Sequence, residues 1–361
     1  MSTSAAAQAK AKELLSGFEA AGATLVETPV LQPAKALLDL YGEDMRARAY
    51  VTSDALRGEQ MLRPDFTVPV VQMHIEAGDD VACYVYSGKV FRRQEIDPSR
   101  PNEYLQVGIE LFQSDDLENA DARAFSSIYQ SLKGQNLRAD TGDIGILMDA
   151  VAGLHTTDRR KQALMRHIWR PKRFRGLLER FAGQIPVPES RARLLASDDP
   201  TYTDAPLIGL RNTSEIAERI DALKEDAAAP PISRVELSTL DALLSVSDRA
   251  DIALTMLQEI ARDMAAIAPA IARLERRLQA LDQAGTDVAA LDFEASYGRT
   301  QMEYYDGFVF GFYAENRTDL PPIASGGRYD ALTRHLGQGR ETPAVGGVIR
   351  PDLLIELEGA R

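Results

Sequence analysis

The chain has 361 residues, 45% of them apolar and 26% charged, and carries a net charge of −13 at pH 7. This length suits two domains or one large domain with an insertion. No apolar run approaches the ~20 residues of a membrane-spanning helix. A single cysteine, Cys83, excludes an internal disulfide, and the four histidines have no metal-ligand spacing. We therefore expect a cytoplasmic protein without a bound metal, and the acidic balance argues against a nucleic-acid binder.

One basic segment runs against this charge balance. Residues 159–175, RRKQALMRHIWRPKRFR, hold eight Lys or Arg, with Trp169 and Phe174 between them. Such a segment could contact phosphate or an acidic partner surface. The sequence favours the alternative, a solvated helix pair broken at Pro171.

The first 150 residues alternate between helical and strand patterns. The last two strands of this region flank a loop of Asp, Pro, Ser and Asn, which predicts a long antiparallel hairpin. The expected helices cover 1–22, 32–42, 66–78 and 118–134, and the expected strands cover 23–29, 47–53, 59–62, 82–95, 103–113 and 141–147.

The second part of the chain changes character twice. Residues 147–285 are almost wholly helical in pattern, and strands return at 291–315. We therefore predict an α+β fold, a mainly antiparallel sheet flanked by helices. One discontinuous core domain would comprise residues 1–150 and 288–361, and residues 151–287 would form a helical insertion.

The strand YLQVGIELF, residues 104–112, has two different faces. One carries apolar residues for a core, and the other carries Gln106, Gly108 and Glu110. A glycine between the two polar residues removes the side chain that would block an approaching ligand. This face predicts a binding site.

Three further segments place polar groups near the expected sheet. Asp65 and Thr67 lie at a strand-to-helix junction, where Asp could simply cap the helix. Arg92 is expected in mid-strand, a costly place for a buried cation without an anion. Tyr304 and Tyr305 are expected to begin a strand. If these strands are adjacent, carboxylates would suit a ligand ammonium and the arginine an anion. Internal pairing or solvent exposure of each residue stays open as the alternative.

The order of these segments resembles the catalytic core of the class II aminoacyl-tRNA synthetases, and histidyl-tRNA synthetase among them. FRRQEIDPSRPNEYLQVGIE, residues 91–110, resembles the second class II motif with its Q-x-G-x-E. LRPDFT resembles the family's R-P-E-G-T, with Asp65 in place of Glu. EYYDGFVF resembles the histidine-specific segment with paired tyrosines, and SGGRYDALTRHLG with TPAVGGVI its closing part. The resemblance covers nearly the whole chain outside the helical insertion.

The departures from this pattern concern ATP and tRNA. Where the synthetase has an arginine-glycine pair before the paired tyrosines, this chain has Thr300 and Gln301. At the Glu-Arg that ends the third motif it has Asp352 and Leu353. Losing such preorganised cations costs transition-state stabilisation at the α-phosphate. The chain also stops where the synthetase continues, so we expect no anticodon-binding domain and no tRNA binding.

This combination resembles the synthetase-like regulatory subunits of ATP phosphoribosyltransferase. The resemblance implies a non-catalytic subunit that forms a hetero-oligomer with a short catalytic subunit, built on dimers of this chain. It would support the first step of histidine biosynthesis and mediate feedback inhibition by histidine, without a cofactor or catalytic residues of its own. The implied histidine site comprises Asp65 and Glu110 at the ammonium, Gln106 to orient it, Arg92 at the carboxylate, Tyr304 and Tyr305 at the imidazole, and Thr67.

Two other classes of function stay open. An enzyme that forms an aminoacyl-adenylate without charging tRNA would show pyrophosphate exchange with ATP. A scaffold protein with an inert pocket would be indifferent to any amino acid.

Overall fold

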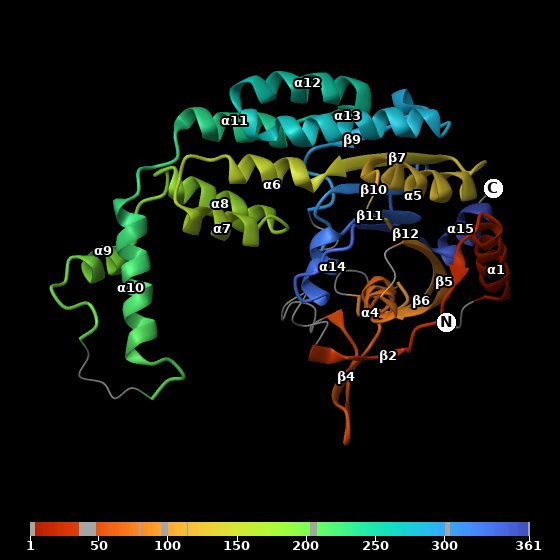
Figure 1. The fold of residues 1–361 in the computed structure, drawn as a ribbon, viewed down its shortest axis with the longest axis horizontal. Coiled ribbons are helices and arrows are strands. Elements are labelled where there is room, and N and C mark those ends of the chain that lie inside the picture. Colours follow the sequence, from red (N-terminus) through yellow and green to blue (C-terminus); the bar gives the residue numbers. More distant parts are fainter. Residues whose placement is uncertain are drawn as a thin grey trace.

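The computed structural model describes residues 4–35, 48–78, 81–94, 100–113, 115–202, 208–299 and 304–359. Within these residues, a nine-stranded sheet runs in the order β1-β5-β6-β12-β11-β10-β7-β9-β8, and only the β1–β5 and β7–β9 pairs are parallel. The predicted α+β class and mainly antiparallel sheet are confirmed (Figure 1). Its strands are β1 (Thr24–Leu25), β5 (Ala82–Phe91), β6 (Glu103–Phe112), β7 (Leu137–Asp143), β8 (Ser247–Arg249), β9 (Asp292–Glu294), β10 (Phe308–Ala314), β11 (Ala324–Arg328) and β12 (Ala344–Ile349).

The helices α1 (Ala5–Ala20), α5 (Leu117–Ser131) and α15 (Pro351–Gly359) pack on the central strands. Phe125 of α5 lies 5.3 Å from Phe310 and 5.1 Å from Phe312, ring centre to ring centre, so aromatic packing joins α5 to β10. On β12, a Cβ on Gly347 would approach Ile128 of α5, whereas a Cβ on Gly346 would meet Glu110. Since neighbouring strand residues point to opposite faces, these helices and Glu110 lie on opposite sides of the sheet.

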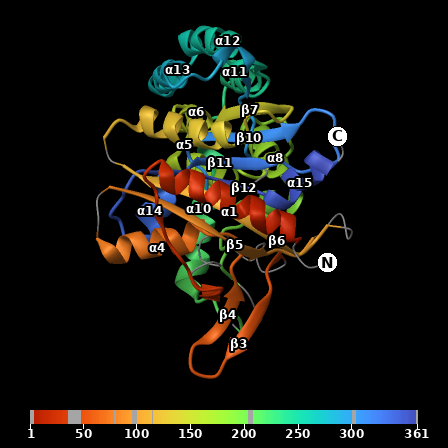
Figure 2. The same cartoon turned by 90° about the vertical axis from the view of Figure 1, so that its right-hand side faces the viewer.

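A second, three-stranded sheet has the order β2-β4-β3 and is antiparallel. Its strands are β2 (Leu31–Pro33), β3 (Val51–Asp54) and β4 (Gly58–Leu62), and the β3–β4 hairpin projects from the body (Figure 2). Helix α4 (Thr67–Ala77) follows and ends at Gly78, whose φ of 77° lies in the left-handed region that favours glycine. The predicted helix at 32–42 begins in β2, and its residues 36–42 lie outside the described residues.

The predicted strand at 141–147 is wrong in its second half. Strand β7 ends at Asp143, whose side chain accepts a hydrogen bond of 2.8 Å from the backbone of Gly145. This cap starts helix α6 (Ile144–Ala152), although its sequence is as apolar as a buried strand. Strand β5 likewise ends at Phe91, so Arg92 follows the strand, and Tyr304 and Tyr305 precede β10.

The range 151–287 is helical, as predicted, apart from β8, which pairs with β9 at the sheet edge. Helix α13 packs on α5, and its buried Arg277 donates to Asp121 (2.7 Å) and Asp143 (2.8 Å). This helix therefore belongs to the packing of the sheet, while the domain boundaries themselves stay a prediction. The helices of this range are α7 (Asp158–Arg166), α8 (Pro171–Phe181), α9 (Glu189–Leu195), α10 (Thr213–Ala228), α11 (Arg234–Leu244), α12 (Ala250–Asp263) and α13 (Ala268–Gln283), with short 3-10 turns at Ala265–Ile267 and Val288–Ala290.

The basic segment 159–175 forms the helix pair α7 and α8, with Pro171 as the first residue of α8. Its aromatic residues point inward, because Phe174 is buried and Trp169 donates to a backbone carbonyl of the core. Arg160 is buried too and pairs with Asp226. The pair thus packs as structure, as the favoured alternative expects.

Helices α9 and α10 form an arm that extends away from the rest of the molecule (Figure 1). Asp226 of α10 fixes the arm, since it accepts hydrogen bonds from Arg160 of α7 and Arg191 of α9, both at 2.5 Å. Burial opposes ionisation of Asp226, but these two guanidinium groups lower its pKa overall.

Candidate functional site

All seven predicted site residues line one cavity of about 200 Å³ on the face of the sheet opposite α5. They come from the start of α4, the end of β5, the middle of β6 and the segment before β10. That a ligand occupies this cavity stays a prediction. The lining comprises Asp65, Thr67, Arg92, Gln106, Glu110, Tyr304, Tyr305, Pro322, Ser325, Tyr329, Gly346, Gly347, Val348 and Arg350.

Glu110 is the most strongly held group of the cavity. Its carboxylate accepts hydrogen bonds from the hydroxyls of Thr67 (2.9 Å), Tyr86 (2.9 Å) and Tyr329. Burial raises the pKa of Glu110 to about 7, although each hydroxyl donor lowers it. Glu110 therefore titrates much closer to neutral pH than an exposed glutamate does, and its hydroxyl donors fix its orientation.

Glycines on two strands make room for this arrangement. Gly108 lies directly across from Tyr86, and a Cβ on Gly108 would overlap the Tyr86 ring. The glycine therefore admits the tyrosine that holds Glu110, rather than a ligand as its pattern suggested. A Cβ on Gly346, the partner of Glu110 on β12, would overlap the Glu110 carboxylate itself.

Gln106 offers an unused acceptor. Its side chain is 1% exposed, and its Oε1 has no hydrogen-bond partner among the described residues. An unmade hydrogen bond of a buried polar atom is costly. Because Gln106 lines the cavity on the same strand face as Glu110, four residues before it, the missing partner is best supplied by an N–H of a ligand.

Asp65 and Arg92 lie together in the wall. Arg92 Nη2 is 3.6 Å from Asp65 Oδ2, and Arg92 Nε donates to the carbonyl of Pro64 at 2.7 Å. Asp65 is 3% exposed. The helix-cap alternative for Asp65 is wrong, because Phe66 holds that position in α4 and no side chain caps the helix.

The paired tyrosines form the aromatic wall. The rings of Tyr304 and Tyr305 meet edge to face with centres 4.8 Å apart, and the Tyr304 hydroxyl lies 3.5 Å from Thr67 Oγ1. Burial and the charge of Glu110 raise the pKa of Tyr305, so its hydroxyl stays protonated. The backbone carbonyl of Tyr305 accepts a 3.0 Å hydrogen bond from Trp169 Nε1.

Sequence reasoning missed Ser325, Tyr329 and Arg350. Ser325 precedes two glycines and Tyr329 lies between Arg328 and Asp330, and neither setting marks a binding face. Arg350 carried one signal, a cation directly after the apolar strand AVGGVI, which ends in the cavity wall. Together the groups line the cavity with both hydrogen-bond acceptors and guanidinium donors.

The positions that depart from the synthetase pattern are only partly visible. Thr300 and Gln301 lie outside the described residues. The neighbouring Arg299 points into the helical range instead, where it donates to the carbonyl of Ile168 at 2.8 Å and lies over the ring of Phe174. Asp352 accepts a 3.1 Å hydrogen bond from the backbone N–H of Leu105.

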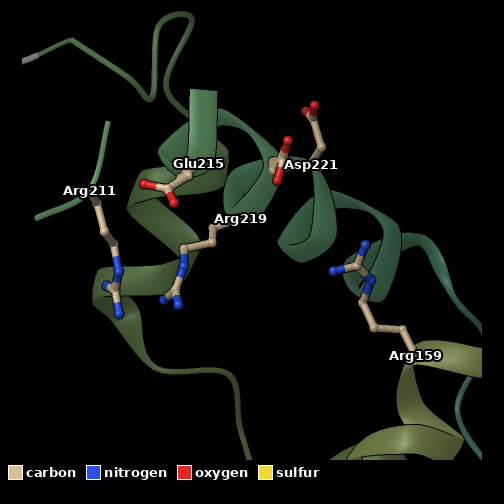
Figure 3. A pocket seen from close by; sticks show the side chains of 6 residues that line it. Arg159, Arg211, Glu215, Arg219 and Asp221 are labelled. Atoms are coloured by element: carbon tan, nitrogen blue, oxygen red, sulfur yellow. The ribbon is translucent and has the colours of Figure 1, made fainter. Parts of the chain in front are cut away.

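A second hollow, of about 520 Å³, lies beside α7 and α10 (Figure 3). All its lining side chains are exposed and its charges balance, three arginines against three acids, so water solvates them. In the part of the chain that the structure describes, no group of His, Cys, Asp and Glu could hold a metal ion, and no helix has the length and apolarity to cross a membrane. The hollow is lined by Arg159, Arg211, Glu215, Glu218, Arg219 and Asp221.

Comparison with known proteins shows the family to which the chain belongs. The family model for histidyl-tRNA synthetase matches residues 2–354. The ATP phosphoribosyltransferase regulatory subunit of Rhizobium johnstonii is 32% identical over 365 residues, which cover 93% of this chain and 94% of the relative. The protein of the same description from Brucella ovis is 32% identical over 360 residues, 94% of each chain.

Solved structures agree on the fold. An ATP phosphoribosyltransferase regulatory subunit/histidyl-tRNA synthetase from Bacillus halodurans has a TM-score of 0.67 at 20% identity, covering 98% of this chain and 79% of the other. Histidyl-tRNA synthetase from Nostoc sp. PCC 7120 has a TM-score of 0.63 at 15% identity, covering 98% and 72%. At these identities the likeness shows the class II synthetase-like fold alone.

Proposed function

Because the chain belongs to the family of ATP phosphoribosyltransferase regulatory subunits, within the wider histidyl-tRNA synthetase family, we propose that it is the non-catalytic partner of a short catalytic subunit. In this proposal it acts in the cytoplasm as a dimer within a hetero-oligomer and supports the first step of histidine biosynthesis. It binds histidine in the cavity as the feedback effector and does not bind tRNA.

The observation that carries the histidine site is the buried Oε1 of Gln106, which has no hydrogen-bond partner among the described residues and lines the same cavity as Glu110. An α-ammonium group has three N–H donors and a positive charge, which these acceptors match. Arg92 and Arg350 line the same cavity and suit the α-carboxylate, while Tyr304 and Tyr305 offer an aromatic wall for the imidazole. Such a set of groups favours a zwitterion with a polar ring.

The size of the cavity favours an amino acid over a nucleotide. Its volume of about 200 Å³ is below the roughly 300–1,000 Å³ of pockets for drug-sized ligands. A single amino acid is smaller than such ligands, whereas ATP together with an amino acid is larger. This favours sensing of histidine over adenylate formation.

Regulation further requires that histidine binds the inhibited and active assemblies with different affinities. The cavity wall offers a route for this difference, because Tyr305 is hydrogen-bonded to Trp169 at the start of the helical range. A movement of the cavity wall on ligand binding would therefore be transmitted to α7 and α8 through this hydrogen bond.

The decisive experiment measures phosphoribosyl-ATP formation by a purified short catalytic subunit, with and without this chain, across a histidine series. We expect higher activity with this chain, or inhibition by histidine that appears only in its presence. Glu110→Gln should shift the inhibition to higher histidine concentrations. The matched control is Arg317→Gln, a change at a partly exposed arginine whose partners Asp319 and Glu356 lie outside the cavity.

Failure of the two proteins to associate, with no change in activity or inhibition, would sink the proposal. Pyrophosphate exchange between ATP and an amino acid would then support the adenylate-forming alternative. Association without any response to histidine would leave a scaffold with an inert pocket.

A further inference from the structure

Arg350 is a guanidinium in the cavity wall, and it has no carboxylate partner among the described residues. Its backbone N–H donates to the carbonyl of Ile323 at 2.9 Å, and its Nη1 donates to the carbonyl of Pro322. It also forms a side-chain hydrogen bond with Tyr104. The Pro322 carbonyl and the Tyr104 hydroxyl are formally neutral, and together they use two of the five N–H donors of the guanidinium.

Three buried arginines of the described residues are paired with carboxylates. Arg277 and Arg328 share the carboxylate of Asp121, and Arg160 pairs with Asp226. Arg63 and Arg299 have no carboxylate partner among the described residues, but each guanidinium lies over an aromatic ring, 4.0 Å from the centre of Phe66 and 4.9 Å from that of Phe174, and neither residue lines the cavity. Among the described residues Arg350 has neither an ion pair nor a ring stacked against its guanidinium, and it lines the cavity.

The electrostatic environment of Arg350 favours a bound anion beside its guanidinium. Burial lowers the pKa of Arg350, and the neighbouring guanidinium of Arg92 lowers it further. Arg92 has an ion pair with Asp65, and the described residues show no ion pair for Arg350. An anion between the two guanidinium groups would relieve their repulsion and replace lost hydration.

Tyr305 lies near groups of both charges, because Glu110, Asp65, Arg92 and Arg350 all interact with it electrostatically. The carboxylates and the guanidinium groups line one cavity of about 200 Å³, and Arg92 is 3.6 Å from Asp65. One small molecule can therefore contact both kinds of group, as the ammonium and carboxylate of an α-amino acid do.

We propose that Arg350 binds the free carboxylate of the amino-acid ligand and makes the cavity select for it. The inference rests on the proposed histidine site and deepens it by naming the group that excludes ligands without a carboxylate. Arg92, which contacts Asp65 and the Pro64 carbonyl, also lines the cavity.

Calorimetric titration with histidine, histidinamide and histamine tests the inference, because all three share the imidazole and an amine and only histidine has a carboxylate. Wild type should prefer histidine by roughly 30- to 100-fold, the worth of a charge-assisted pair. Arg350→Gln should lose most of this preference by weakening histidine alone. Glu110→Gln should weaken all three ligands, since it acts on the ammonium.

Arg350→Lys keeps the charge but not the fork, so it should retain part of the preference and also covers the case in which Arg350→Gln does not fold. Arg317→Gln is the matched arginine control and should behave as wild type. Equal binding of histidine and histidinamide by wild type, or full preference in the Arg350 variants, would overturn the inference. No binding of any of the three ligands would instead overturn the proposed histidine site.

Discussion

At the scale of single residues, the cavity is built around a carboxyl group whose ionisation depends on what it contacts. Glu110 is fully enclosed by three hydroxyl donors, and burial raises its pKa to about 7. A ligand ammonium beside it would favour the ionised form and lower this pKa. Binding would therefore release a proton from the fraction of molecules in which Glu110 is protonated.

The first prediction concerns the pH dependence of histidine binding. Because ionised Glu110 is the binding form, affinity should rise with pH through about 7, by about tenfold between pH 6 and pH 8. Calorimetry at pH 6, 7 and 8 in two buffers of different ionisation enthalpy measures both affinity and proton release. Glu110→Gln should keep only the dependence that comes from histidine itself, and identical pH slopes in the two proteins would contradict the prediction.

The alternation of polar and apolar residues along a strand predicts some residues of the site but not others. The polar face of β6 was predictable, because Gln106 and Glu110 recur with period two. The role of Gly108 was not, since its space is taken by Tyr86 of the neighbouring strand, which only the pairing register reveals. Arg350 escaped for a similar reason, because it follows its strand and no alternation marks it.

At the scale of elements, the connection between α7 and α8 is tied to the cavity wall at two points. Trp169 donates to the Tyr305 carbonyl at 3.0 Å, and Arg299 donates to the carbonyl of Ile168 at 2.8 Å. Both bonds join the helical range to the chain that leads into the paired tyrosines. The position of the aromatic wall thus depends on elements more than 100 residues away in sequence.

Trp169→Phe tests this dependence by removing one donor while keeping an aromatic ring. A net hydrogen bond is worth about 0.5–1.5 kcal/mol, so histidine affinity should fall between roughly two- and tenfold. Calorimetric titration measures it, and Arg173→Gln, an exposed change on α8, is the control that should leave affinity unaltered. Unchanged affinity in a folded Trp169→Phe protein would show that the wall stands without this contact.

Element type was predictable from periodicity where polar residues interrupt the pattern, as in β5, β6 and α4. It failed at 141–147, because a run of apolar residues fits a buried strand and a buried helix equally well. The deciding group there is the Asp143 side chain, which caps α6. Asp143 also accepts from Arg277 of α13, so a contact over 134 residues stabilises the same carboxylate.

At the scale of the whole molecule, the helical range 151–287 contributes to the body and to a projecting arm. Helix α13 and strand β8 join the packing and pairing of the large sheet. The arm of α9 and α10 is attached through α7 and lies away from the cavity, whose lining residues come from 65–110 and 304–350. Helical periodicity identifies the helices but not their partners, so sequence alone could not separate the arm from α13.

The structure indicates where the arm can be removed. Gly183 and Pro231 are adjacent, with 3.8 Å between a Cβ built on Gly183 and the Cβ of Pro231, and the Ile232 N–H donates to the Phe181 carbonyl at 2.9 Å. A linker of one or two glycines in place of residues 184–230 should therefore join α8 to α11 without moving either helix. Arg160 would lose Asp226 but gain water, above the ring of Phe181.

We expect the shortened chain to fold and to bind histidine with wild-type affinity, because none of the removed residues that the structure describes lines the cavity. Thermal melting and calorimetric titration measure the two properties, and the same excision with Glu110→Gln provides the binding-deficient control. Lost or clearly weakened histidine binding in a folded shortened chain would contradict this and place the arm among the supports of the site. Deletion of the whole range 151–287 should instead prevent folding, since it removes α13 and leaves Asp121 and Asp143 without Arg277.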